Sequence, residues 1–171
     1  FRRVLFRSVV VRRPGPGETA FRTLDGVDRA IGPDMLLICD AKRPVAVAGV
    51  MGGLDSEVTD GTRDLLIECA LFDPKSIRAT RRALGLSTDA SYRFERGVDP
   101  EGMELALRRV LEIVLATAGG RVEAQVADAA PRRFTRTRIP LRPARVRQVL
   151  GVEFSASALA DLLRPLGFQV G

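Results

Sequence analysis

The run from Leu65 to Cys69 is short, apolar and compatible with a β-strand, yet it contains one carboxylate, Glu68. A plain buried strand would carry another aliphatic residue at this position. A carboxylate in apolar surroundings accepts a hydrogen bond from a phenolic hydroxyl at good strength, which would let Glu68 recognise such a group. From these residues alone, an ion pair between Glu68 and a nearby arginine is the simpler interpretation, because buried charges are normally paired.

Small polar residues run from Thr88 to Ser91, a composition typical of a loop that offers hydroxyls and backbone N–H groups to a ligand. Taken alone, Thr88 and Ala90 are ordinary loop residues. The glycines of Ala48–Gly53 have neither dinucleotide-binding nor P-loop spacing, so the simplest role of Gly49 is to let the backbone turn and pack closely.

The composition excludes several kinds of chemistry. The 171 residues include no histidine, which removes histidine general bases, Ser-His-Asp and Cys-His nucleophiles and histidine-based zinc sites. We expect no metal site in this chain. The net charge of +6, carried mostly by arginine, is compatible with a polyanionic partner, although abundant arginine does not prove one.

Cysteine usage and hydropathy indicate the compartment. Cys39 and Cys69 lie separately in apolar runs, and we predict that both are buried, reduced thiols. No apolar run approaches the roughly 18 residues that would span a membrane, and no signal-peptide core begins the chain. We therefore expect a cytoplasmic protein without membrane contact.

The elements that must position these residues form an α+β fold. Short apolar runs predict an antiparallel or mixed sheet, with strands at Val9–Arg12, Phe21–Leu24, Met35–Cys39, Val45–Val50 and Leu65–Cys69. Asp73-Pro74 and Gly85 predict the two ends of a short helix. A longer helix, Glu101–Ala118, has one apolar face and is expected to pack on the sheet as a core helix, followed by a strand at Arg121–Ala127.

We divide the chain into four segments. Residues 1–8 fit poorly with the rest and are either a sequence artefact or a frayed edge strand. Residues 9–128 form the main domain, expected to be truncated at its N-terminal end, and 129–138 form a linker. Residues 139–171 predict two helices and a strand at Phe168–Val170, the first half of a small winged-helix-like module.

Residues 132–147 contain seven arginines and no acid. This run could contact an RNA backbone or could be a solvated face between domains, and both interpretations stay open. The arginines are Arg132, Arg133, Arg136, Arg138, Arg142, Arg145 and Arg147.

Several phrases together resemble the β subunit of bacterial phenylalanyl-tRNA synthetase, in that family's order and spacing. They are LDG (24–26), AGVMGG (48–53), DSEV (55–58), IECALFDP (67–74), RRALGLSTDASYRFERGVDP (81–100) and, more weakly, LGVEFS and LLRPLGFQV near the end. The resemblance implies the editing region of that subunit, which hydrolyses tyrosine wrongly attached to tRNA(Phe), with the start of the following domain.

The resemblance also implies roles for four residues. Glu68 matches the glutamate that binds the tyrosine hydroxyl, and Thr88 matches a residue whose hydroxyl lines the wall of the pocket. Ala90 matches a small residue that leaves room for the aromatic ring. Gly49 matches a glycine whose backbone lines the pocket. No side chain is expected to act as the catalyst, since a positioned water and the substrate's own ribose hydroxyl would cleave an already reactive ester.

The resemblance further implies partners and cofactors for a parent enzyme. These are an α subunit in an α2β2 assembly and tRNA(Phe), with ATP and Mg²⁺ used elsewhere in that enzyme and no cofactor on this chain. The family's pocket also uses a histidine from a segment that precedes the counterpart of Val9, so we expect the isolated chain to be inactive. The alternative is a non-catalytic module that only packs against other parts of the synthetase and binds tRNA.

Overall fold

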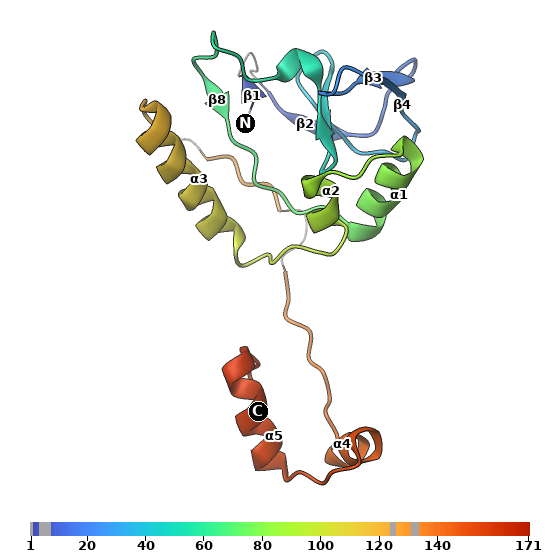
Figure 1. Ribbon diagram of the computed structural model, residues 1–171, viewed down its shortest axis with the longest axis vertical. Helices are drawn as coiled ribbons and strands as arrows, with labels where there is room; N and C mark the ends of the chain where they lie inside the picture. The colour runs from blue at the N-terminus through green and yellow to red at the C-terminus, as the bar shows by residue number, and fades with distance from the viewer. Residues whose placement is uncertain (1, 4–7, 124–125, 131–133) are drawn as a thin grey trace. The chain divides into compact units, whose positions relative to one another are not determined.

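The computed structural model describes residues 2–3, 8–123, 126–130 and 134–171, which fall into two compact units, residues 1–126 and 127–171 (Figure 1). Among the described residues, no helix is both long and apolar enough to cross a lipid bilayer.

Antiparallel strands form the centre of the first unit, as the sequence predicts. A four-stranded sheet has the order β2-β5-β6-β7, built from β2 (Val10–Arg12), β5 (Leu37–Cys39), β6 (Pro44–Val47) and β7 (Met51–Gly52). A hairpin pairs β3 (Ala20–Arg22) with β4 (Asp28–Ala30), and β1 (Arg2–Arg3) pairs with β8 (Leu65–Leu66). A 3-10 turn, η1 (Leu54–Ser56), follows β7. Together with the helices this confirms the α+β fold.

The core lies on both faces of β5 and β6 because all three residues of β5 are buried. Leu37, Cys39 and Val47 belong to the larger cluster, which Ile77 joins, whereas Ile38 and Ala46 belong to a smaller cluster with other residues. The alternation follows from the two-residue period of a strand. It places the thiol of Cys39 in the core, as expected.

Helix α1 (Pro74–Leu84) begins and ends where the sequence predicts. The Asp73 carboxylate accepts a hydrogen bond from the Ser76 N–H at 2.8 Å, and Gly85 ends the helix in the left-handed conformation with φ of 64°. Ile77, Thr80 and Leu84 form its buried face. At the C-terminal end, the Arg29 guanidinium donates to the Leu84 carbonyl at 3.2 Å, which ties the β3–β4 hairpin to α1.

Helix α2 (Asp89–Phe94) stands where the sequence analysis expects a loop, so that expectation is wrong. The Thr88 hydroxyl accepts from the Ser91 N–H at 3.1 Å, and the Ser91 hydroxyl accepts from the Thr88 N–H at 3.0 Å. This reciprocal capping starts the helix, because the same small polar residues that favour loops also favour helix N-termini.

Helix α3 (Met103–Ala118) is not the core helix that its apolar face predicts, because none of its residues is buried. The larger core cluster takes its helical residues from α1, Ile77 and Leu84, and none from α3. The strand expected at Arg121–Ala127 is also wrong for residues 121–123 and 126–127, while residues 124–125 lie outside the described residues.

The strand expected at Leu65–Cys69 is shorter than predicted, since β8 contains only Leu65 and Leu66. The chain beyond Leu66 leaves the two-stranded pairing with β1. As a result Cys69 is exposed, which corrects the prediction of a buried thiol, and its Sγ lies 3.4 Å from the Met103 carbonyl.

The second unit contains α4 (Pro143–Leu150), α5 (Ala156–Leu163) and the 3-10 turn η2 (Arg164–Leu166). Ser155 caps α5 by accepting a hydrogen bond from the Ala158 N–H at 3.1 Å. Residues 168–170 form no strand, so that expectation is wrong. The winged-helix interpretation stays a prediction.

The strand predicted at Val45–Val50 ends at Val47, and a turn containing Gly49 leads into β7. The Gly49 backbone has φ of +65°, which L residues with a side chain rarely adopt. A Cβ built on Gly49 would lie 2.7 Å from Ile77 Cδ1 and 2.8 Å from Phe72 Cδ2. Gly49 therefore meets both a conformational and a steric requirement.

We expect Gly49→Ala to lower the free energy of unfolding by about 2–5 kcal/mol, the sum of the left-handed backbone cost and overpacking. Gly85→Ala is the matched control, because Gly85 has φ of +64° but no atom within 4 Å of an added Cβ. It should cost only about 1–2 kcal/mol. Urea unfolding of both variants measures the difference. Equal losses in the free energy of unfolding would show that the contact with Phe72 and Ile77 does not add to the cost of the Gly49 substitution.

Candidate functional site

The structure places three of the four predicted site residues in one neighbourhood. The Thr88 hydroxyl donates a hydrogen bond of 2.7 Å to the Val50 carbonyl, across 38 positions of sequence. Val50 follows Gly49 in the turn after β6, and Ala90 lies in the first turn of α2, two residues after Thr88. This bond therefore brings the Gly49 turn, Thr88 and Ala90 together.

Aromatic side chains border the same region. Phe72 contacts the Gly49 turn, and its ring meets Phe94 of α2 edge to face with 4.9 Å between the ring centres. Such pairs are attractive beyond the area they bury. The Gly49 turn thus has an apolar wall on the Phe72 side, while the Thr88 hydroxyl supplies a polar group.

Glu68 differs most from its predicted setting. It lies beyond the end of β8, and the residue is exposed where a buried position was expected. An exposed carboxylate keeps most of its hydration, so a phenol would gain less from bonding to it than from a buried acceptor. The role of Glu68 as a reader of a hydroxyl stays a prediction.

Two hollows in the described part of the chain, each of about 230 Å³, have walls that do not include Gly49, Glu68, Thr88 or Ala90. One of them lies between the β3 hairpin and the start of β6, with Glu18, Phe21, Arg43 and Asp55 in its wall. In those described residues, no three acidic, cysteine or histidine side chains are grouped as a metal site would need.

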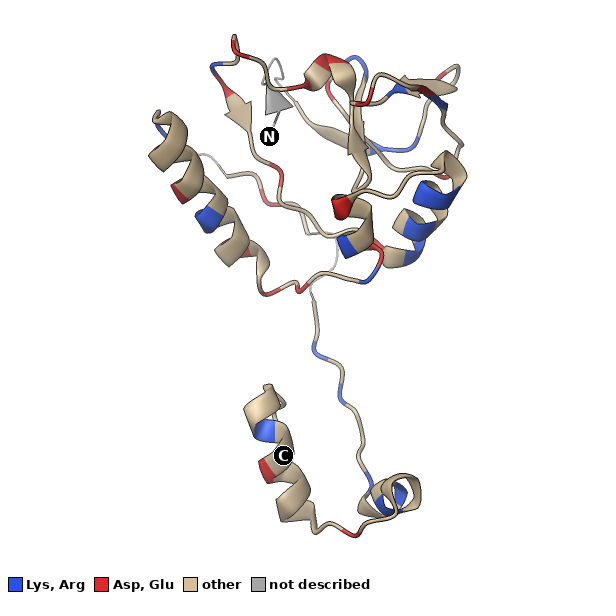
Figure 2. Cartoon of the chain, in the orientation of Figure 1, with Lys and Arg blue, Asp and Glu red and all other residues tan. Residues whose placement is uncertain are grey.

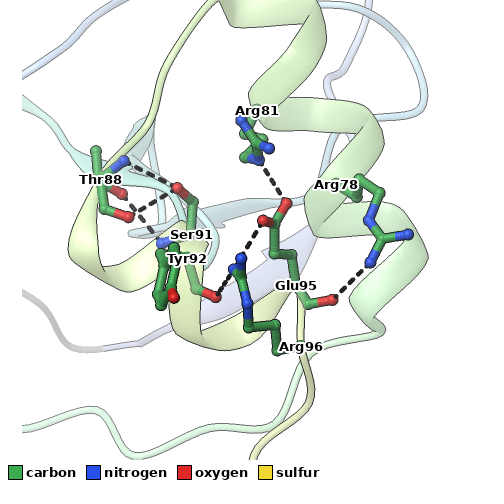
Figure 3. A network of polar contacts seen from close by, with 7 residues as sticks. All are labelled: Arg78, Arg81, Thr88, Ser91, Tyr92, Glu95 and Arg96. Carbon is green, nitrogen blue, oxygen red and sulfur yellow. Dashed lines mark hydrogen bonds and ion pairs between the residues drawn. The ribbon is translucent and has the colours of Figure 1, made fainter.

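Glu95 organises a polar network that the sequence analysis missed (Figure 3). Although only 7% exposed, its carboxylate accepts from Arg81 Nε at 2.5 Å and from Arg96 Nη1 at 3.0 Å. Its backbone carbonyl accepts from Arg78 Nη2 at 3.4 Å. The network joins α1 to the end of α2, and the only sequence signal for it is an acid set among arginines.

These arginines also shift the ionisation of Glu95. The hydrogen bond from Arg81 is the main cause that lowers the pKa of Glu95, opposed by burial and helped by the charges of Arg81, Arg96 and Arg78. Because the pKa is lower in the folded state, ionised Glu95 stabilises the fold above its unfolded pKa, and that contribution is lost as the pH falls through its folded pKa.

Comparison with known proteins defines the class. Residues 3–119 match the B3/4 domain family, so the chain belongs to the B3/4 domain family. Over 163 residues, 95% of its length, it is 50% identical to the phenylalanine–tRNA ligase β subunit of Salinibacter ruber, and over 162 residues 50% identical to that of Moorella thermoacetica. The Desulfotalea psychrophila β subunit is 44% identical over 99% of the chain. These matches confirm the resemblance stated from the sequence.

The chain spans about a fifth of the length of these curated relatives. Each of these relatives is a phenylalanine–tRNA ligase β subunit.

Removing the Thr88 hydroxyl should destabilise the protein. Thr88→Val keeps the shape but leaves the Val50 carbonyl and the Ser91 N–H without their partner, so we expect a loss of about 1–2 kcal/mol in the free energy of unfolding. Thr88→Ser should stay close to the parent chain. Thr117→Val, which removes an exposed hydroxyl bonded only within α3, should change stability by less than about 0.5 kcal/mol. Urea titration tests this, and a Thr88→Val curve that overlays the parent would contradict it.

Acid should weaken the fold partly through Glu95. We expect the urea midpoint to fall as the pH drops below about 4.5, the range where an unfolded glutamate begins to protonate. Glu95→Gln should lower the midpoint at neutral pH and show a smaller further fall in acid. Glu57→Gln, at an exposed glutamate, should follow the parent chain. If Glu95→Gln keeps the full acid dependence, other carboxylates are responsible for it.

Proposed function

We propose that this chain carries out post-transfer editing within a phenylalanyl-tRNA synthetase, hydrolysing tyrosine wrongly attached to tRNA(Phe). The observation that supports this most directly is the 2.7 Å hydrogen bond from Thr88 to Val50, which gathers three of the four expected pocket residues around one turn. The proposal places the chain in a cytoplasmic enzyme made of α and β subunits. In that enzyme ATP and Mg²⁺ act at the aminoacylation site of the α subunit.

The need for such a site follows from the chemistry of the two amino acids. Tyrosine differs from phenylalanine by one para hydroxyl, and a hydrophobic pocket rejects an added hydroxyl only weakly. A second site that hydrogen-bonds this hydroxyl discriminates far better, because phenylalanine would leave a polar group unpaired.

In the proposed pocket, the tyrosyl ring lies beside the backbone of Gly49 and the small side chain of Ala90, with Thr88 at its edge. Glu68 accepts the phenolic hydrogen, and its exposure makes it reachable by an incoming ligand. A Glu68 that holds the para hydroxyl is a ring length away from the ester, so it is not the base. A water molecule, helped by the substrate's ribose hydroxyl, attacks the ester carbonyl.

A non-catalytic module that binds tRNA is the second candidate. The arginine content favours it, because α1 contains three arginines, Arg93 lies on α2 and Arg96 follows α2. Hydrolysis distinguishes the two candidates.

The test replaces the matching region of the Salinibacter ruber β subunit with residues 9–128 of this chain and assembles the chimera with its α subunit. We expect hydrolysis of Tyr-tRNA(Phe) in preference to Phe-tRNA(Phe). Glu68→Ala should slow tyrosine release about tenfold or more, the loss of a hydrogen bond to a charged acceptor, and change phenylalanine release little.

Glu57→Ala, at another exposed glutamate, is the control and should leave both rates unchanged. Equal losses on both substrates would remove the assignment of Glu68. A chimera that still aminoacylates tRNA but hydrolyses neither ester would establish the non-catalytic module instead.

A further inference from the structure

We propose that an exposed face of α1 and α2 binds single-stranded RNA, with one base stacked on Tyr92 and the phosphates held by arginines. We call this face the Tyr92 patch; it consists of Arg78, Arg82, Tyr92, Arg93 and Arg96. The binding surface is argued from its own geometry. That the RNA is the unpaired 3′ end of a tRNA rests on the proposed function.

Tyr92 and Arg96 form a preassembled stack. The Arg96 guanidinium lies over the Tyr92 ring, 3.5 Å from the ring centre, and its Nη1 donates to the Tyr92 carbonyl at 2.8 Å and to Glu95 at 3.0 Å (Figure 3). Three contacts thus fix one guanidinium. Tyr92 is nevertheless 55% exposed. Because Arg96 lies over one face of the ring, we expect a base to stack on the opposite face.

The surrounding charge is positive and incompletely neutralised. Helix α1 contains four cationic residues and no acid, and Figure 2 shows the cations spaced along it. The buried Glu95 carboxylate serves both Arg81 and Arg96, so one negative charge faces two positive ones. Arg82 and Arg93 are exposed, and among the described residues no carboxylate forms an ion pair with either. Arg82 lies one helical turn after Arg78, which puts both on one face of α1.

This combination fits single-stranded RNA better than other anions. Guanidinium groups bind phosphates in a planar, two-pronged geometry, and an aromatic ring beside them supplies a stacking platform for a base. A duplex hides its base faces, and inorganic phosphate has none. A single strand offers both groups along its length.

The patch also lies next to the proposed pocket. Tyr92 follows Thr88 by one turn of α2, and its N–H donates to the Thr88 carbonyl at 2.9 Å. An RNA whose terminal ester lay at Thr88 would have its adjoining nucleotides beside Tyr92. The same short helix would then hold the amino acid at its start and the RNA farther along.

Tyr92 makes the first test direct, because it is the one tyrosine in a sequence without tryptophan. Intrinsic tyrosine emission therefore reports on this ring alone. We expect an oligoadenylate of roughly eight nucleotides, a length within the usual range for such surfaces, to quench the emission in a saturable way. Inorganic polyphosphate of similar charge should not quench it. Equal quenching by the two, or none by the oligoadenylate, would overturn the stacking proposal.

The second test uses the polarisation of an end-labelled oligoadenylate with the full chain. Tyr92→Leu should weaken binding at least about fivefold, whereas Tyr92→Phe, which keeps a stacking ring, should bind like the parent. Arg82→Ala and Arg93→Ala should each reduce the slope of log K against log salt by about 0.7. Arg109→Ala, at an exposed arginine of α3, is the control and should leave the slope unchanged.

The outcomes separate this proposal from the proposed function. Tyr92-dependent RNA binding by a chain that fails the hydrolysis test would support the patch and remove the editing role. If Tyr92→Leu and Tyr92→Phe bind RNA equally well, the patch is not an RNA surface, whatever the hydrolysis shows. The same result would turn attention to an acidic protein surface as the partner of these arginines.

Discussion

The hydroxyl of Thr88 is the group on which the rest of the candidate site depends. It accepts from Ser91 at the start of α2 and donates to Val50 in the turn after β6, so one side chain satisfies two backbone groups far apart in sequence. Ser91, the residue that completes this cap, is fully buried. A backbone group left unpaired there would cost free energy, so α2 has little freedom to rotate or slide on the sheet. The positions of Ala90 and Tyr92 follow from this constraint, because both lie on the helix that Thr88 starts.

Glu95 provides the second fixed point, at the other end of α2. A buried carboxylate is unfavourable unless it is paired. Here the Glu95 carboxylate accepts hydrogen bonds from Arg81 of α1 and from Arg96, the next residue in the chain. The sharing has a consequence for the surface. Since one acid cannot neutralise two guanidinium groups, the α1–α2 face keeps an excess of positive charge even though its central acid is buried. Stability at Glu95 and positive charge at Tyr92 therefore arise from the same arrangement.

Features set by interactions between residues close in sequence could be predicted, whereas features set by contacts between distant segments could not. The limits of α1 were predictable because Asp73, Pro74 and Gly85 act within one turn of their own positions. Helix α2 was not, because Thr88–Ser91 has the composition of both a loop and a helix cap, and the Phe72–Phe94 contact that holds the helix joins distant segments. The amphipathic pattern of α3 indicates an apolar face but not what covers it. Glu68 was misplaced for a similar reason, because β8 pairs with the distant segment β1, and the apolar run by itself does not show how far that pairing extends. For Gly49, the sequence predicted a turn with close packing, but it did not reveal the packing partners, Phe72 and Ile77, which come from distant segments.

Under the proposed function, the Gly49 turn and the Tyr92 patch bind different parts of the same substrate. If no side chain of this chain acts as the catalyst, the rate must come from position and fixed dipoles, and binding energy from parts of the substrate remote from the reacting bond can supply that position. RNA held at Tyr92 would place the ester before the amino acid is tested. The contact that distinguishes tyrosine from phenylalanine then need not hold the whole substrate. Selectivity depends only on the difference in binding free energy between the tyrosyl and phenylalanyl esters. One hydrogen bond from the tyrosine hydroxyl to an exposed carboxylate such as Glu68 can supply that difference, because hydrogen bonds to charged acceptors are among the stronger ones.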